Sequence, residues 1–260
     1  MSRVRAFRKQ VPAGAARYPA WEAAGLRWLA DASAAGGADV VEVLEVGPSH
    51  LDLRRLDPSP ATSGHARALG RGLARTHAAG APAYGSGPPG WVGHGWLGPT
   101  SEPLPLVLGS WTSWGPFLAE ARILPLVREG RDRGVLDVGE VAALERLASV
   151  AASGALDTGD PPARLHGDLW SGNVVWTASG AVLVDPAAHG GHREADLAML
   201  ALFGCPHLDD VVAGYEEVGP LADGWRERVG LHQVHPLLLH AVLFGGSYAS
   251  RAVAAARATT

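Results

Sequence analysis

Residues 165–173 read Leu-His-Gly-Asp-Leu-Trp-Ser-Gly-Asn, and Asp185 follows twelve residues later, directly after the apolar run Ala-Val-Leu-Val. Two carboxylates, Asp168 and Asp185, therefore lie close in sequence to the carboxamide of Asn173. Between Asn173 and Asp185, two short apolar segments flank Ala-Ser-Gly at 178–180, a pattern typical of a β-hairpin. We expect this hairpin to hold Asn173 and Asp185 at its two ends, where they face each other.

These three side chains have the chemistry that phosphoryl transfer needs. One carboxylate must orient the attacking hydroxyl, while an amide and a second carboxylate hold the Mg²⁺ ions that neutralise the nucleotide phosphates. We assign Asp168 as the catalytic base and Asn173 and Asp185 as the metal ligands. Taken alone, Asp and Asn at this spacing are common in loops, where they cap backbone groups. The hairpin pattern and the N-terminal segment favour the catalytic interpretation.

The N-terminal segment supplies a lysine and a glutamate in a suitable order. Residues 4–10 alternate hydrophobic and basic side chains, which predicts a short strand that ends near Lys9. Residues 18–32 place their apolar side chains on roughly one face, which predicts a helix with Glu22 near its start. Such a strand and helix could bring Lys9 and Glu22 together.

The pattern changes near residue 57. Two further strands, residues 39–46 and 50–56, are predicted on either side of a Gly-Pro-Ser turn, and the Pro-rich tetrapeptide 57–60 then interrupts the chain. We therefore predict an α+β protein with two lobes. The N-lobe (residues 1–57) is small and β-rich, and the C-lobe (residues 58–260) is larger and mainly helical.

Helical periodicity dominates the C-lobe. The predicted helices cover residues 62–79, 114–131, 138–152, 194–203, 208–218 and 225–256. A Gly-Gly pair at 245–246 should break the last of them. The long segment 80–109 is rich in Gly and Pro and predicts irregular structure, as functional or poorly ordered loops often show.

Composition excludes several classes of protein. The 260 residues are 47% hydrophobic and 18% charged, enough for a substantial core. The net charge is −4 and no basic run stands out, so we expect no nucleic-acid partner. No apolar stretch could span a membrane or follow the basic N-terminus as a secretory signal. The single cysteine, Cys205, excludes an intrachain disulfide and a thiolate metal cluster, and it favours a reducing cytoplasm.

Eleven histidines raise the possibility of a zinc hydrolase. His189 and His192 are three residues apart, as are His232 and His235, and one helical face can use this spacing to bind zinc. The Gly-Gly pair at 190–191 argues against a helix at the first pair, and no Cys or carboxylate clearly completes a tetrahedral set. Zinc chemistry is therefore the weakest of the alternatives.

The chain resembles the fructosamine kinases (ketosamine-3-kinases), which share a protein-kinase-like fold with aminoglycoside and choline kinases. The resemblance is carried by His-Gly-Asp-Leu-Trp-Ser-Gly-Asn at 166–173, Asp-Pro-Ala at 185–187 and Gly-His-Arg-Glu-Ala-Asp-Leu-Ala-Met at 191–199. It extends to segments in both predicted lobes, namely residues 22–26, 69–77 and 244–248. The resemblance implies the two-lobed protein-kinase-like fold, with ATP and Mg²⁺ as cofactors.

The resemblance also implies how the nucleotide is held. Lys9 would contact the nucleotide phosphates and pair with Glu22, and residues 53–57 would form the hinge on the adenine side. Within that hinge we assign three residues to nucleotide binding: Arg54, Arg55 and Leu56. No glycine-rich phosphate loop precedes Lys9, which departs from the usual pattern. Arg5 or Arg8 is an alternative phosphate contact.

For the acceptor, the resemblance implies a ketosamine, either free or bound to a protein, that is phosphorylated at O3. Trp170 would stack on the sugar ring or its cationic amine, and His189 and His192 would line the pocket beside it. The family carries an aromatic pair where this chain has His-Gly at 189–190. His166 and Asp196 would support the catalytic loop through its backbone. Phosphorylation at O3 would prime the adduct for elimination, and hence for deglycation.

Two alternatives stay open at this point. The chain could be a kinase for another small hydroxylated amine, as aminoglycoside and choline kinases are. It could also be a nucleotide-binding module with little catalysis, which the missing glycine-rich loop suggests. We expect a monomer or a weak dimer.

Overall fold

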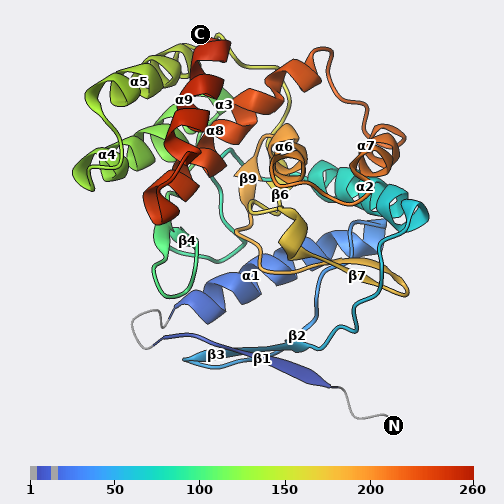
Figure 1. Ribbon diagram of the computed structural model, residues 1–260. Coiled ribbons are helices and arrows are strands. Elements are labelled where there is room, and N and C mark those ends of the chain that lie inside the picture. Colours follow the sequence, from blue (N-terminus) through green and yellow to red (C-terminus); the bar gives the residue numbers. More distant parts are fainter. Residues whose placement is uncertain (1–4, 13–16) are drawn as a thin grey trace.

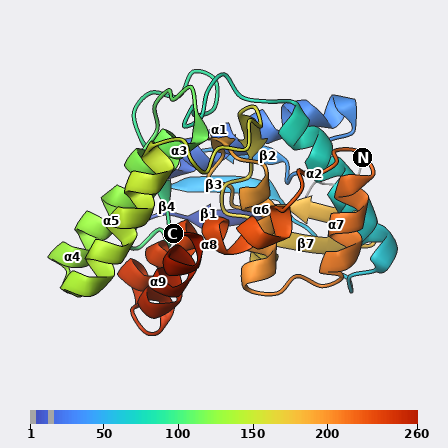
Figure 2. The same cartoon turned by 90° about the horizontal axis from the view of Figure 1, so that it is seen from above.

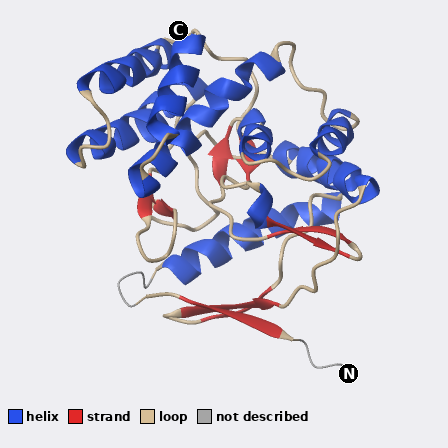
Figure 3. Ribbon diagram, viewed as in Figure 1, coloured by secondary structure: helices blue, strands red, loops and turns tan. Residues whose placement is uncertain are grey.

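The computed structural model describes residues 5–12 and 17–260. A three-stranded antiparallel sheet lies at one end, most of the helices lie at the other, and the long helix α1 runs between them (Figure 1). Figure 3 shows the same arrangement by secondary structure, with the three-stranded sheet below the helical part. None of the described helices is long and apolar enough to cross a membrane.

The sheet contains β1 (Ala6–Gln10), β2 (Val43–Val46) and β3 (His50–Arg54) in the order β1-β3-β2. It confirms the three strands predicted within residues 1–57, although position 4 of the first prediction lies outside the described residues. Apolar side chains on one face of the sheet pack against α1 (Tyr18–Ala30) and form a small core. This core contains Ala23, Leu26, Val41, Leu51 and Leu53.

The predicted helices of the larger part are present with small changes at their ends. They are α2 (Ser63–Ala78), α3 (Trp114–Phe117), the π-helix η3 (Leu118–Ile123), α4 (Leu124–Asp132), α5 (Val138–Ala152), α6 (Glu194–Leu202), α7 (Leu208–Glu216), α8 (Trp225–Phe244) and α9 (Tyr248–Thr259). Local chemistry explains several boundaries. The Thr62 side chain caps α2, and Asp137 and Glu140 form a capping box at α5. Gly245 and Gly246 have φ of 66° and 69°, which ends α8 where the sequence predicts a break.

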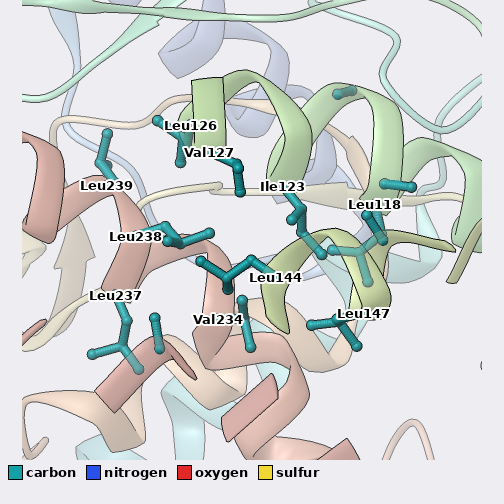
Figure 4. Close-up of a cluster of buried hydrophobic side chains, with 14 of the residues drawn as sticks. Leu118, Ile123, Leu126, Val127, Leu144, Leu147, Val234, Leu237, Leu238 and Leu239 are labelled. Atoms are coloured by element: carbon teal, nitrogen blue, oxygen red, sulfur yellow. The ribbon is translucent and has the colours of Figure 1, made fainter. Parts of the chain in front are cut away.

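The main hydrophobic core lies among η3, α4, α5 and α8 (Figure 4). Its side chains include Ile123, Leu144, Leu147, Val234 and Leu238, all almost fully buried. Seen from above, α4, α5 and α9 lie to one side of the molecule and the packed pair α2 and α7 to the other (Figure 2).

The described residues also form three two-stranded antiparallel sheets. The predicted hairpin is β7 (Val174–Thr177) with β8 (Gly180–Leu183). The prediction of irregular structure for residues 80–109 is wrong in part, because β4 (Gly95–Leu97) pairs there with β5 (Leu104–Leu106). The sequence also gives no sign of β6 (Ala163–Leu165) and β9 (His189–Gly191). Strands of three residues are too short to show a period of two, and only their tertiary partners define them.

Candidate active site

Asp168 lies on the loop between β6 and the short 3₁₀ helix η4 (Ser171–Asn173). The Asn173 side-chain nitrogen donates to the Asp168 carbonyl oxygen at 2.8 Å and to its carboxylate Oδ2 at 3.1 Å. Burial raises the pKa of Asp168 to about 6, against the opposing effect of the Asn173 hydrogen bond. This carboxylate is therefore anchored through one oxygen, and the other oxygen can accept a proton from an acceptor hydroxyl.

The loop before Asp168 is held by buried hydrogen bonds. Asp196 Oδ2 accepts from the backbone N–H of His166 at 2.8 Å, and Asp196 Oδ1 accepts from the N–H of Gly167 at 3.0 Å. His166 Nε2 lies 2.9 Å from the Val184 carbonyl oxygen. Within the loop, the Asp168 N–H also donates to His166 Nδ1 at 3.3 Å. Gly167 has φ of 81°, and a Cβ there would meet the Ala187 carbonyl oxygen, so the loop needs glycine.

His77 completes the support of the loop from α2. Its Nδ1 lies 2.8 Å from the Tyr215 hydroxyl and its Nε2 lies 3.1 Å from Asp196 Oδ2. The histidine is buried and both ring nitrogens have partners, so it packs and orients its neighbours.

Asp185 follows β8 and adopts a left-handed backbone with φ of 54°. This conformation is uncommon outside glycine and often marks functional positions. The Asn173 side-chain nitrogen lies 3.4 Å from the Asp185 carbonyl oxygen, and the Val184 N–H donates to the Asn173 carbonyl oxygen at 3.1 Å. The hairpin thus brings Asn173 and Asp185 together, as predicted. Both offer the hard oxygen atoms that Mg²⁺ prefers as ligands.

Lys9 extends from β1 into this cluster. Its Nζ lies 2.7 Å from Glu22 Oε2 on α1 and 3.0 Å from Asp185 Oδ1. Burial alone would lower the pKa of Lys9, but the negative charges of Glu22 and Asp185 raise it above its ordinary value. A charged ammonium therefore stands beside the proposed metal ligands. Gly25 allows α1 to lie close to the segment that follows Asp185, because a Cβ at this position would lie 3.2 Å from the Cβ of Ala188.

The two arginines that could replace Lys9 point to other partners. Arg8 donates to the Asp52 carboxylate at 2.7 and 2.6 Å, and Arg5 lies 3.7 Å from Asp57. Lys9 is the side chain of the three that contacts Asp185.

A cavity of about 410 Å³ opens beside Asp185, between the sheet and the β7–β8 hairpin. Its lining includes the three hinge residues assigned from the sequence, Arg54, Arg55 and Leu56. The remaining lining residues are mostly apolar: Phe7, Val41, Leu53, Pro58, Val175 and Val184. An apolar slot with charged groups at its edge suits a purine base linked to phosphates.

Phe7 is a lining residue that the sequence prediction missed. It is 51% exposed, which is unusual for a large aromatic side chain, and it faces this cavity from β1. Phe7 and Lys9 are two residues apart, so they lie on the same face of the strand. That alternation is the sequence signal that could have identified Phe7.

A second cavity, of about 60 Å³, lies next to Asp168. His189 and His192, predicted to contact the acceptor, both line it. Trp170 does not line it: its side chain is 40% exposed and meets the Phe203 ring edge-on at 6.2 Å. Leu169 is fully buried in the core, so the extended backbone directs the next side chain outward. The pocket shared by Trp170 and His189 is thus not formed here, and stacking of Trp170 on the acceptor stays a prediction.

The histidines do not form the zinc pairs considered from the sequence. His192 and His232 instead approach Glu194, with the potential ligand atoms of these three residues within 4.8 Å of one another. Arg228 donates to both Glu194 oxygens, at 2.9 and 2.6 Å, and His192 Nε2 lies 2.8 Å from the Thr158 hydroxyl. A guanidinium already neutralises the only carboxylate of this trio, which argues against a dication at the same place.

Comparison with known proteins agrees with this geometry. The model of the fructosamine kinase family matches residues 4–259. A probable ketoamine kinase of Vibrio parahaemolyticus is 36% identical over 158 residues, covering 60% of this chain and 51% of that protein. Another, from Synechocystis, is 34% identical over 186 residues, covering 71% of this chain and 58% of that protein. The chain thus spans little more than half the length of these curated relatives.

Solved structures show the same likeness. The crystal structure of a putative fructosamine-3-kinase from Thermobifida fusca has a TM-score of 0.87 and 45% identity, covering 97% of this chain and 84% of that one. A choline/ethanolamine kinase family protein from Mesorhizobium loti shares the fold, with a TM-score of 0.58 and 17% identity over 97% of this chain and 86% of that one. The predicted two-lobed protein-kinase-like fold is confirmed. The chain therefore belongs to the fructosamine kinase family.

Proposed function

We propose that this chain is an ATP-dependent kinase that phosphorylates a hydroxyl of ketosamines, at O3. The observation that carries the proposal is the position of Asn173, whose side-chain nitrogen contacts both Asp168 and Asp185. Each aspartate lines its own cavity. A nucleotide in the cavity beside Asp185 and an acceptor that reaches into the smaller cavity beside Asp168 would therefore meet at Asn173.

Each residue has a defined task in this reaction. The Asn173 carboxamide oxygen and the Asp185 carboxylate fit Mg²⁺, which would be bound with ATP and neutralise its phosphates. Lys9, held by Glu22, would position those phosphates. Asp168 would align the acceptor hydroxyl and take its proton as the hydroxyl oxygen bonds to the γ-phosphorus. The bond from that phosphorus to the β–γ bridging oxygen would break, and ADP would leave.

The substrate class rests on the family. Relatives of this chain are described as probable ketoamine kinases, and the T. fusca structure as a putative fructosamine-3-kinase. We infer a role in deglycation, because a ketosamine phosphorylated at O3 can eliminate phosphate and release its amine. A cytoplasmic location and a monomeric or weakly dimeric state stay predictions.

An acceptor panel tests the proposal. ADP release would be measured with MgATP and a ketosamine, an aminoglycoside, choline or homoserine as the acceptor. We expect release that depends on the ketosamine. Activity with only one of the other acceptors would overturn the substrate class. Nucleotide binding without release for any acceptor would favour a module with little catalysis.

A further inference from the structure

Arg122 is buried in the wall of the cavity next to Asp168. It belongs to the π-helix η3 (Leu118–Ile123), which joins α3 to α4, and its side chain is only 3% exposed. Short π-helical turns inside α-helices are frequent at functional sites. Arg122 and Asp168 line the same cavity of about 60 Å³. The fold therefore places a guanidinium in the pocket that holds the proposed catalytic base.

The contacts of Arg122 leave part of its bonding capacity unused. Nη1 donates to the carbonyl oxygens of Val107 at 2.8 Å and Ala121 at 3.0 Å, and the guanidinium lies over the Phe117 ring at 4.5 Å. Nη2 is buried and has no hydrogen-bond partner among the described residues. No carboxylate within the described part of the chain forms a salt bridge with Arg122. A buried cation without a counter-ion is costly.

Two other inward-facing cations of the described residues are paired with carboxylates. Lys9 has Glu22, and Arg228 has Glu194. The two carboxylates that line the cavity are engaged elsewhere, Asp196 by the backbone of the catalytic loop and Asp168 by Asn173. Arg122 is thus a cation whose counter-ion the described chain does not supply.

The rest of the cavity suits a small anion. Its lining includes His189 and several apolar side chains, such as Trp114, Leu118 and Leu239. Burial, followed by the positive charge of Arg122, lowers the pKa of His189 to about 3, so this histidine is neutral. Burial lowers the pKa of Arg122 itself to about 9, which leaves the guanidinium charged at neutral pH. A volume of about 60 Å³ accommodates a few water molecules or one compact charged group.

We propose that the Arg122 guanidinium binds an anionic group of the acceptor, so that this chain prefers ketosamines that carry a carboxylate or a phosphate. This inference rests on the proposed function and specifies its substrate class. The charge could be the carboxylate of a glycated amino acid or the phosphate of a sugar-phosphate adduct. Both match the fork of a guanidinium, which forms strong charge-assisted hydrogen bonds with either group.

Titration calorimetry on the full chain tests the preference without requiring turnover. Fructosylglycine would be compared with its amide, which lacks the carboxylate, and N-methylfructosamine 6-phosphate with N-methylfructosamine, which lacks the phosphate. We expect the anionic member of at least one pair to bind roughly tenfold more tightly or better. The pair that shows the difference identifies the source of the charge. Equal affinities within both pairs, or binding of no member, would overturn the inference.

Variants test whether Arg122 is responsible. Arg122→Met and Arg122→Gln should each bring the affinity ratio of the sensitive pair close to one, with thermal unfolding as the check that they fold. Arg164→Met is the matched control, because Arg164 also donates to backbone carbonyl oxygens and covers a tryptophan ring, but does not line the cavity. The control should retain the wild-type ratio. A folded Arg122 variant that also retains it would exclude Arg122 as the anion contact.

These measurements separate the inference from the proposed function. Turnover of N-methylfructosamine, which carries no anionic group, with MgATP tests whether the chain is a ketosamine kinase. The affinity ratio tests only whether the acceptor pocket prefers an anion. A kinase that binds ketosamines with and without an anionic group equally well would keep its function and lose this inference.

Discussion

The Lys9 ammonium lies 3.0 Å from a carboxylate oxygen of Asp185. This contact joins the three-stranded sheet to the segment that follows β8, and Glu22 holds the same ammonium from α1 at 2.7 Å. The first strand, the first helix and a segment more than 150 residues later therefore meet at one charged cluster. In the proposed reaction, this cluster is where the phosphates of the nucleotide would bind.

Replacing Lys9 with alanine should raise the KM for ATP and lower turnover, each by at least roughly tenfold, because the phosphates would lose their positioning charge. Glu22→Gln should have the same effect more weakly, since it leaves Lys9 without its anchor. Steady-state kinetics at varied ATP measures both. Arg8→Ala is the control, because Arg8 pairs with Asp52. Normal kinetics in Lys9→Ala would move the phosphate contact to another residue.

Asp185→Asn should remove the dependence of nucleotide binding on Mg²⁺. The carboxylate is the only charged ligand in the proposed pair with Asn173, and an amide binds Mg²⁺ far less strongly. Calorimetry with ADP, with and without Mg²⁺, measures the effect. If the variant still gains affinity from Mg²⁺ as the wild type does, the ion is bound elsewhere.

Asp196→Ala should destabilise the fold by about 3 kcal/mol or more, because it leaves buried donors without an acceptor. Those donors are the N–H groups of His166 and Gly167, together with the His77 ring. Urea unfolding followed by fluorescence gives the free energy. Asp209→Ala, at an exposed helix N-terminus, is the control and should cost less than about 1 kcal/mol. A similar small loss in Asp196→Ala would show that the catalytic loop does not depend on it.

Acid should destabilise the folded chain below about pH 6.5. Burial lowers the pKa of His189 to about 3 and that of His232 to about 4, from an ordinary value of 6.5. Below pH 6.5 the unfolded chain binds protons that these two histidines do not bind when folded. The free energy of unfolding should therefore fall by up to about 1.4 kcal/mol per pH unit for each, until the folded-state pKa is reached. Urea unfolding at several pH values measures this slope.

His232→Gln should flatten that slope between pH 6.5 and 4. The charged and titratable groups that face His232 are Glu194, Arg228 and His192. Burial raises the pKa of Glu194, but hydrogen bonds from His232 and Arg228 outweigh it and lower this pKa from 4.5 to about 2. Glu194 therefore lowers the free energy of unfolding only when the pH falls below its ordinary pKa of 4.5. His207→Asn changes an exposed histidine and is the control. An unaltered slope in His232→Gln would exclude His232 as a source of the pH dependence.

The sequence predicts the Asp185 side of the site well because its information is local. A hairpin with a clear turn places Asn173 beside Asp185, and strand alternation carries Lys9 into the sheet. The lobe boundary after residue 57 stays a prediction, although the three-stranded sheet and α1 lie before it.

The acceptor side could be predicted only in part, because tertiary contacts define it. His189 enters the cavity on β9, a strand that exists only through its pairing with β6. Arg122 comes from a helix whose periodicity indicates packing, and its missing counter-ion is visible only once the neighbours are known. Trp170 looks like a pocket residue from its place in the motif, but the burial of Leu169 directs it outward.

In the proposed reaction, Asp168 directs phosphoryl transfer from ATP to a ketosamine hydroxyl. ³¹P NMR of a reaction with MgATP and a ketosamine tests it most directly, using the wild type and Asp168→Asn. We expect a new sugar phosphomonoester at O3 with the wild type. In Asp168→Asn we expect its formation to be slower by roughly a hundredfold or more, with nucleotide affinity almost unchanged. No phosphomonoester with the wild type, or its formation at a similar rate in Asp168→Asn, would contradict the claim.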